Sequence, residues 1–153
     1  ECPVEALPEL KAVLDAVHVQ FADVKSENMG VGSTIFAVKP GDGSAREQAA
    51  SCQKVLGGWA NIANEYATKR YRSNLINWGM LPFLIPEGDL PFSNGDYLFI
   101  PDVKKAVEDK LTEIQAYVVK DGELKSFTLQ MGGLTDDERE IILKGCLINY
   151  NRR

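Results

Sequence analysis

Histidine and cysteine are scarce in this sequence. His18 is the single histidine among 153 residues, and the three cysteines, Cys2, Cys52 and Cys146, show no Cys-x-x-Cys spacing. Most histidine-based acid–base catalysis and most zinc sites are therefore excluded. An odd number of cysteines without this spacing is typical of free thiols in a reducing compartment, so we expect a cytoplasmic protein.

Long apolar runs and an excess of basic residues are missing as well. The longest apolar candidates, such as residues 80–85, are short and interrupted by proline, and no basic leader precedes an apolar segment. We therefore predict no membrane span and no secretory signal. Asp and Glu number 22 against 17 Lys and Arg, which argues against nucleic-acid binding through phosphate contacts.

The remaining composition is that of an ordinary globular protein. Hydrophobic residues make up 44% and charged residues 25% of the chain, which excludes a disordered protein. The length of 153 residues is enough for one core. We therefore predict a single domain over residues 1–153.

Apolar periodicity and turn residues predict helices and strands that alternate along the chain. Helices are expected at residues 7–18, 44–56, 68–78 and 103–111 and after Thr135, and strands at residues 33–39, 60–66, 80–85, 97–100, 114–119 and 124–131. The strand at 33–39 is expected to be short and buried, and the last two strands form a hairpin. Thr135 and Glu138 have the spacing of a capping box. This order predicts a mixed α/β fold.

One loop has the composition of an anion site. Residues 39–48 (Lys-Pro-Gly-Asp-Gly-Ser-Ala-Arg-Glu-Gln) join an expected strand to a helix N-terminus, where free backbone N–H groups attract anions. Ser44 is expected to cap the helix, with Glu47 completing a capping box. Arg46 lies at the same opening and could grip a carboxylate through two parallel hydrogen bonds. The loop therefore indicates a carboxylate or phosphate site.

A purely structural interpretation of this loop stays open. Ser44 would then be only a helix cap and Arg46 a solvated residue of the first turn, because short motifs often match by chance. The segment is not a Walker loop, since it lacks the Gly-Lys-Ser/Thr ending. It is not a dinucleotide fingerprint, since the third glycine and the acidic partner are missing.

The string at residues 43–50 resembles a family signature. Gly-Ser-Ala-Arg-Glu-Gln-Ala-Ala is similar to the Gly-Ser-Ser-Arg-Glu-His-Ala signature of the swivelling domain of the aconitase superfamily. Further similar strings follow in the family's order at residues 60–67, 74–82, 134–142 and 145–150. The resemblance covers the chain from Phe36 to the C-terminus, and several ordered strings are more specific than one alone.

The resemblance implies a β/β/α swivelling domain, of the type found in aconitate hydratase and in the small subunit of isopropylmalate isomerase. Such a domain is completed by three domains that carry a [4Fe–4S] cluster, on the same chain or on a large subunit. This chain itself would hold no metal or cofactor. By the same resemblance, Ser44 would be the catalytic base, and Gly43, Ser44 and Arg46 would bind a small polycarboxylate substrate.

Two positions depart from the signature. Ala45 replaces a serine, which removes one substrate contact of the family, and Gln48 replaces a histidine. Both departures imply that the chain is closer to a divergent hydratase branch of the family than to the enzyme that acts on citrate, so the resemblance does not identify the substrate. The family's further arginine, from an earlier loop, has only loose candidates in Lys25 and Lys39.

The other chemically active side chains have simpler interpretations. Cys52 and Cys146 lack the spacing of cluster ligands and are expected to pack as small apolar residues. His18 is expected to interact with the C-terminal dipole of the first helix. The remaining charged and aromatic residues are expected on a solvated face (Lys69, Arg70, Arg72), at a helix N-terminus (Asp136, Asp137, Glu138), or as core and interface anchors (Trp59, Tyr71, Trp78).

The sequence alone is consistent with three candidate functions. The first is the C-terminal domain of a larger hydro-lyase that dehydrates and rehydrates a hydroxy di- or tricarboxylate and is inactive without its cluster domains. The absence of methionine at Glu1 favours a piece of a longer polypeptide. The second is a free-standing small subunit of an isopropylmalate isomerase-like enzyme, and the third is a non-catalytic anion-binding domain.

Overall fold

A mixed sheet runs through the protein, with the strand order β1-β2-β3-β6-β5-β4. The structure is a computed structural model and describes residues 7–152. These form two compact units, the first comprising residues up to 31, 88–101 and 115–128, and the second residues 32–87, 102–114 and 129 onward. The predicted mixed α/β fold is confirmed.

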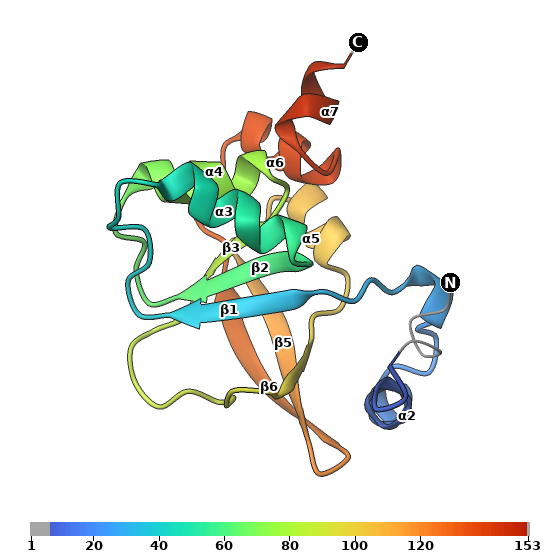
Figure 1. The fold of residues 1–153 in the computed structure, drawn as a ribbon. Coiled ribbons are helices and arrows are strands. Elements are labelled where there is room, and N and C mark those ends of the chain that lie inside the picture. Colours follow the sequence, from blue (N-terminus) through green and yellow to red (C-terminus); the bar gives the residue numbers. More distant parts are fainter. Residues whose placement is uncertain (1–6, 153) are drawn as a thin grey trace. The chain divides into compact units, whose positions relative to one another are not determined.

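The second unit is built on three parallel strands. β1 (Ser33–Ala37) pairs with β2 (Gly58–Ala63), which pairs with β3 (Leu81–Leu84). The connections are α3 (Arg46–Val55) and α4 (Lys69–Asn77), which lie side by side over the sheet (Figure 1). Leu84 pairs with Gln130 at the end of β6 in antiparallel sense. This arrangement places the β1–α3 and β2–α4 loops at the same edge of the sheet.

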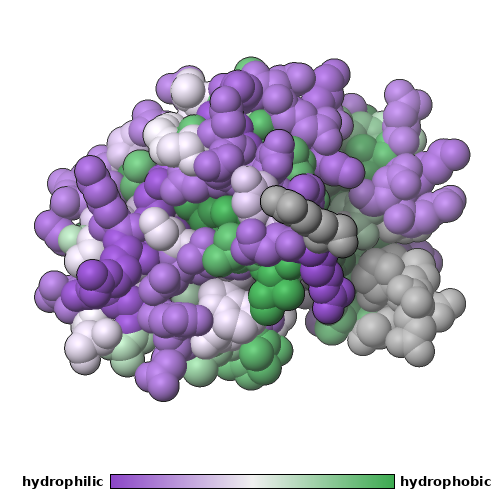
Figure 2. All heavy atoms as spheres, turned by 90° about the horizontal axis from the view of Figure 1, so that it is seen from above, coloured by the Kyte–Doolittle hydropathy of each residue, from purple (hydrophilic) through white to green (hydrophobic). Residues whose placement is uncertain are grey.

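Three shorter helices complete the second unit. They are α5 (Val103–Glu108), α6 (Asp136–Leu143) and α7 (Leu147–Asn151). The predicted capping box of α6 is confirmed, because Thr135 and Glu138 exchange hydrogen bonds between side chains and backbone. Most of the surface seen in Figure 2 is hydrophilic, with a few hydrophobic side chains between the polar ones.

The core of the second unit lies between the sheet and the helices. Its largest side chains with almost no exposed surface are Ile62, Leu75, Ile76, Met80 and Phe83. They come from β2, α4 and β3, whose apolar residues follow the periods of a strand and of a helix. Burial of these side chains fixes the helices on the sheet.

The first unit combines one longer helix with the remaining strands. α2 (Leu10–Gln20) is followed by a 3₁₀ turn at Ser26–Asn28. β4 (Tyr97–Phe99) pairs with β5 (Glu113–Lys120), which is followed by β6 (Glu123–Gln130). Between β5 and β6, Asp121 and Gly122 both have positive φ angles, as the predicted hairpin turn requires. No helix within residues 7–152 is long and apolar enough to cross a membrane.

Some predicted details are wrong. β1 is mostly exposed, not buried, because it lies at the edge of the sheet and has only β2 beside it. Ile35, for example, is 42% exposed. The first described helix starts at Leu10, three residues later than predicted, and residues 8 and 9 form the turn before it.

Candidate functional site

The candidate site is the loop of residues 38–45 between β1 and α3. It leaves the carboxyl end of β1 beside the β2–α4 loop, on the side to which the arrowheads of β1 and β2 point in Figure 1. Ligands of open α/β sheets bind outside the carboxyl ends of the strands. The position of the loop therefore suits a binding site.

Backbone hydrogen bonds tie the first half of this loop to the β2–α4 loop. Glu65 N donates to Val38 O at 3.0 Å, and Ala67 N donates to Pro40 O at 2.9 Å. At the surface, Lys39 Nζ lies 2.9 Å from Glu65 Oε2. This hydrogen bond, with the attraction between the two charges, raises the pKa of Lys39. Lys39 is thus already paired, whereas Lys25, the other loose candidate, belongs to the first unit.

Ser44 does not cap α3, so the predicted capping box is wrong. The helix begins at Arg46, and the N-cap is Ala45, whose methyl group cannot accept a hydrogen bond. Ser44 lies one residue too early, and the side chain of Glu47 accepts a hydrogen bond from Trp78 Nε1 at 3.1 Å instead. The first backbone N–H groups of α3 therefore have no side-chain cap, and such groups attract anions.

Arg46 is the cation at this helix start. Its side chain is partly buried, and its Nε is buried without a hydrogen-bond partner. Among the residues that the structure describes, no carboxylate lies within ion-pair distance of it. A guanidinium with spare donors beside a helix N-terminus is chemically suited to bind a carboxylate.

Gly43 and Ser44, which precede this helix start, are both exposed. The Ser44 hydroxyl makes no hydrogen bond to any of residues 7–152. A Cβ added at Gly43 would meet no atom within 4 Å. The structure thus brings Gly43, Ser44 and Arg46 together on one short segment.

Cys52, Cys146 and His18 show no feature of a catalytic or metal-binding group. Cys52 is exposed on α3, contrary to the expected packing, and Cys146 is partly buried at the start of α7. Cys2 lies outside the described residues. His18 stands in the last turn of α2, and its Nε2 hydrogen-bonds Val24 O at 2.7 Å. Within residues 7–152, no three His, Cys, Asp or Glu side chains form a group that could hold a metal ion.

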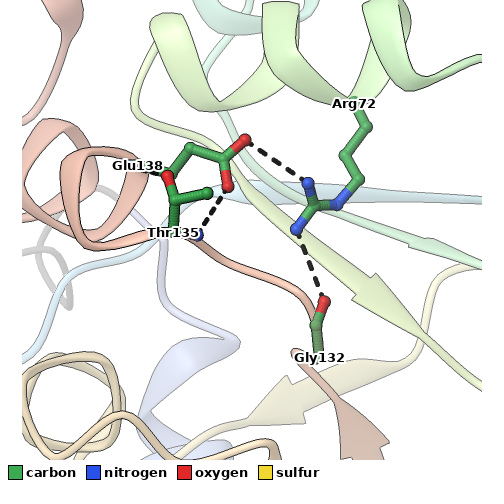
Figure 3. A network of polar contacts seen from close by, with 4 residues as sticks. All are labelled: Arg72, Gly132, Thr135 and Glu138. Atoms are coloured by element: carbon green, nitrogen blue, oxygen red, sulfur yellow. Dashed lines mark hydrogen bonds and ion pairs between the residues drawn. The ribbon is translucent and has the colours of Figure 1, made fainter.

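Arg72 has a structural role that the sequence did not reveal. Figure 3 shows its guanidinium between two segments: Nη1 lies 3.4 Å from Glu138 Oε1, and Nη2 donates to Gly132 O at 3.4 Å. Glu138 Oε2 also accepts from Thr135 N at 2.8 Å. Arg72 therefore links α4 to the cap of α6, whereas Lys69 and Arg70 are solvated as expected.

The three predicted aromatic anchors differ in burial. Tyr71 is 2% exposed, Trp78 is partly buried, and Trp59 is 50% exposed. A fourth aromatic residue, Tyr66, was not singled out by the sequence. Its hydroxyl donates to the carbonyls of Asn61 and Phe83, and burial raises the pKa of Tyr66 well above its usual value. Tyr66 therefore remains a neutral structural donor.

Comparison with known proteins supports the family resemblance. The family model of the aconitase C-terminal domain matches residues 18–88, a range that includes β1, α3 and the candidate loop. Aconitate hydratase A of Rickettsia bellii (strain RML369-C) is 27% identical over 148 residues. The match covers 93% of this chain but only 16% of the length of that relative.

Proposed function

We propose that this chain, which carries an aconitase-like C-terminal domain, is the swivelling domain of a larger hydro-lyase. That enzyme would remove water from, and add it to, a hydroxy di- or tricarboxylate. The observation that carries the proposal is the start of α3, where Arg46 has no acidic partner among the described residues and the helix has no side-chain cap. The family match over this segment supports it.

In this proposal Arg46 anchors a substrate carboxylate and Gly43 lets the ligand approach the backbone. A guanidinium can donate two parallel hydrogen bonds to a carboxylate, which fixes the orientation of the substrate as well as its position. The open space at Gly43 leaves the neighbouring N–H groups accessible. The uncapped N-terminus of α3 favours the same negative charge.

Ser44 takes the proton from the carbon next to the carboxylate. A serine hydroxyl is a weak base unless its alkoxide is stabilised, and the partial positive charge of a helix N-terminus and a nearby guanidinium provide such stabilisation. The described residues offer no group that could hold a [4Fe–4S] cluster. In the complete enzyme, the cluster on the other domains would act as the Lewis acid for the departing hydroxyl group.

The first test is ligand binding by the chain itself. Tricarballylate, a tricarboxylate without a hydroxyl group, is titrated into ¹⁵N-labelled protein, and we expect amide shifts at Gly43 and Ser44 with a dissociation constant on the order of 1 mM. Arg46→Gln should abolish these shifts, whereas the control Arg70→Gln changes an exposed arginine of α4 and should not. Equal binding by Arg46→Gln would refute the anchor.

The second test separates chemistry from binding in the complete enzyme. Ser44→Ala should lower kcat by about 100-fold or more with little change in KM, because it removes the proton acceptor. Arg46→Lys should mainly raise KM, because a point charge cannot reproduce a two-pronged grip. Normal turnover of Ser44→Ala would leave Ser44 without a catalytic role.

A non-catalytic carboxylate-binding domain is the second candidate function. The observation that favours it is that the Ser44 hydroxyl has no hydrogen-bond partner within residues 7–152. This candidate predicts the same binding of tricarballylate through Arg46. It also predicts normal activity of the complete enzyme for Ser44→Ala, so the kinetic test decides between the two.

A further inference from the structure

We infer that Tyr71 is a positioning residue for the candidate site, because its ring packs against Gly41 at one end of the segment that carries Ser44 and its hydroxyl is hydrogen-bonded to α3, the helix that follows the segment. The ligand in this inference is that of the proposed function. The geometry is independent of that function, since it depends only on how Tyr71 contacts the loop and α3.

Tyr71 is itself held by hydrogen bonds at its backbone N–H and at its side-chain hydroxyl. Its backbone N donates to Thr68 Oγ1 at 3.1 Å in the cap of α4. Its hydroxyl accepts hydrogen bonds from Gln53 Nε2 at 2.9 Å and from Asn61 Nδ2 at 3.1 Å. With 2% of its surface exposed, the ring has little freedom to move. Tyr71 therefore connects α4, α3 and β2 rigidly.

Gly41 rests directly on this ring. A Cβ at Gly41 would lie 2.4 Å from Tyr71 Cβ and 2.5 Å from Cγ, so only glycine allows the backbone to approach so closely. Its φ of 95° is also a conformation that other residues rarely adopt. The hydroxyl of Thr68 donates to Gly41 O at 3.3 Å and holds the same point from the side.

The segment beyond Gly41 has no anchor of its own. Asp42, Gly43 and Ser44 make no hydrogen bond to the described residues, and the next one along the chain joins Ala49 N to Ala45 O at 3.0 Å. The segment thus spans two fixed points, Gly41 and the start of α3. Tyr71 contacts Gly41 through its ring, and its hydroxyl is hydrogen-bonded to Gln53 of α3.

Two substitutions of Tyr71 distinguish its ring from its hydroxyl. Tyr71→Phe keeps the ring against Gly41, whereas Tyr71→Leu removes it. Leu75→Ala is the matched control, because Leu75 is fully buried one turn further along the same helix and belongs to the same core cluster. The measurements are the ¹H–¹⁵N nuclear Overhauser effects of Gly43 and Ser44 and the affinity for tricarballylate. They are made at a temperature at which circular dichroism shows each variant folded.

We expect Tyr71→Phe to bind tricarballylate within about threefold of the unmodified chain and Tyr71→Leu at least about tenfold more weakly. In Tyr71→Leu the Overhauser effects of both amides should fall, while in Leu75→Ala both readouts should stay unchanged despite lower stability. Should Tyr71→Leu not fold, Tyr71→Met replaces it, since it also removes the ring from Gly41 and should lower the Overhauser effects in the same way.

Two results would overturn the inference. One is unchanged loop order in Tyr71→Leu, or in Tyr71→Met if that variant replaces it. The other is an equal loss in Leu75→Ala, which would make Tyr71 an ordinary core residue. If instead the unmodified chain does not bind tricarballylate, the proposed function fails, but the Overhauser comparison still decides whether Tyr71 positions the loop.

Discussion

Gly57 and Gly79 occupy the same position after two neighbouring helices but have different surroundings. Gly57 follows α3 with a φ of 86°, and Gly79 follows α4 with a φ of 70°. A Cβ on Gly57 would meet no atom within 4 Å, whereas a Cβ on Gly79 would lie 1.8 Å from the carbonyl oxygen of Gly145. Alanine at the two positions therefore separates backbone strain from a steric overlap.

The expected magnitudes follow from these surroundings. A left-handed conformation costs an alanine about 1–2 kcal/mol, and its more restricted unfolded chain offsets about 0.4–1 kcal/mol of this. Gly57→Ala should therefore lower the free energy of unfolding by roughly 1 kcal/mol. Gly79→Ala adds an overlap between two backbones, which costs about 1–3 kcal/mol more when the structure shifts to relieve it.

Thermal and urea unfolding followed by circular dichroism measures the difference. In a protein of this size each kcal/mol shifts Tm by about 2–4 °C, so Gly79→Ala should melt well below Gly57→Ala. The contact between Gly79 and Gly145 lies within the second unit, where α4 and the end of α6 meet. Equal losses for the two variants would refute this close approach.

Two further predictions concern ion pairs. Arg72→Met should lower the free energy of unfolding by about 1–2 kcal/mol, because it leaves the partly buried Glu138 without its cation. The control Lys144→Met removes an exposed ion pair and should cost less than about 0.5 kcal/mol, and urea unfolding of both variants measures the difference. A hydrogen bond from Lys110 and its charge lower the pKa of Asp136. The stabilisation by this ion pair is therefore present above the unfolded-state pKa of Asp136 and is lost as the pH falls through its lower, folded-state pKa. Lys110→Met should remove this contribution to the pH dependence of Tm, measured by melts between pH 2 and pH 6 at about physiological ionic strength.

The sequence predicted the elements whose signals are local. The capping box at Thr135 and Glu138 and the hairpin turn between β5 and β6 are each formed by residues close together in the chain, and both appear in the structure. The apolar run before the Gly-Asp-Gly turn and the helix formers after it placed the candidate loop correctly between a strand and a helix. These features depend on short-range hydrogen bonds and on backbone conformations that few residue types adopt.

The errors concern properties that depend on distant segments. Apolar residues in β1 do not reveal that this strand lies at an edge, since that depends on which strands pair. The partner of Arg72 is 66 residues away along the chain, so helix periodicity could only suggest a solvated face. The support of Gly41 by Tyr71 was missed for the same reason, although a Gly-Asp-Gly turn indicates that some close approach or unusual φ is required.

The beginning of α3 differs from those of α4 and α6, which belong to the same unit, in a way that bears on the proposed function. Thr68 caps α4 and Thr135 caps α6, each through a side-chain oxygen, whereas α3 starts after Ala45 without such a bond. A missing cap costs about 1 kcal/mol. Ser44 is only one residue away from the capping position, so this cost arises from the way in which the loop is held. If the proposed carboxylate site is correct, an anion bound there would supply the missing acceptors, and tricarballylate should therefore raise Tm.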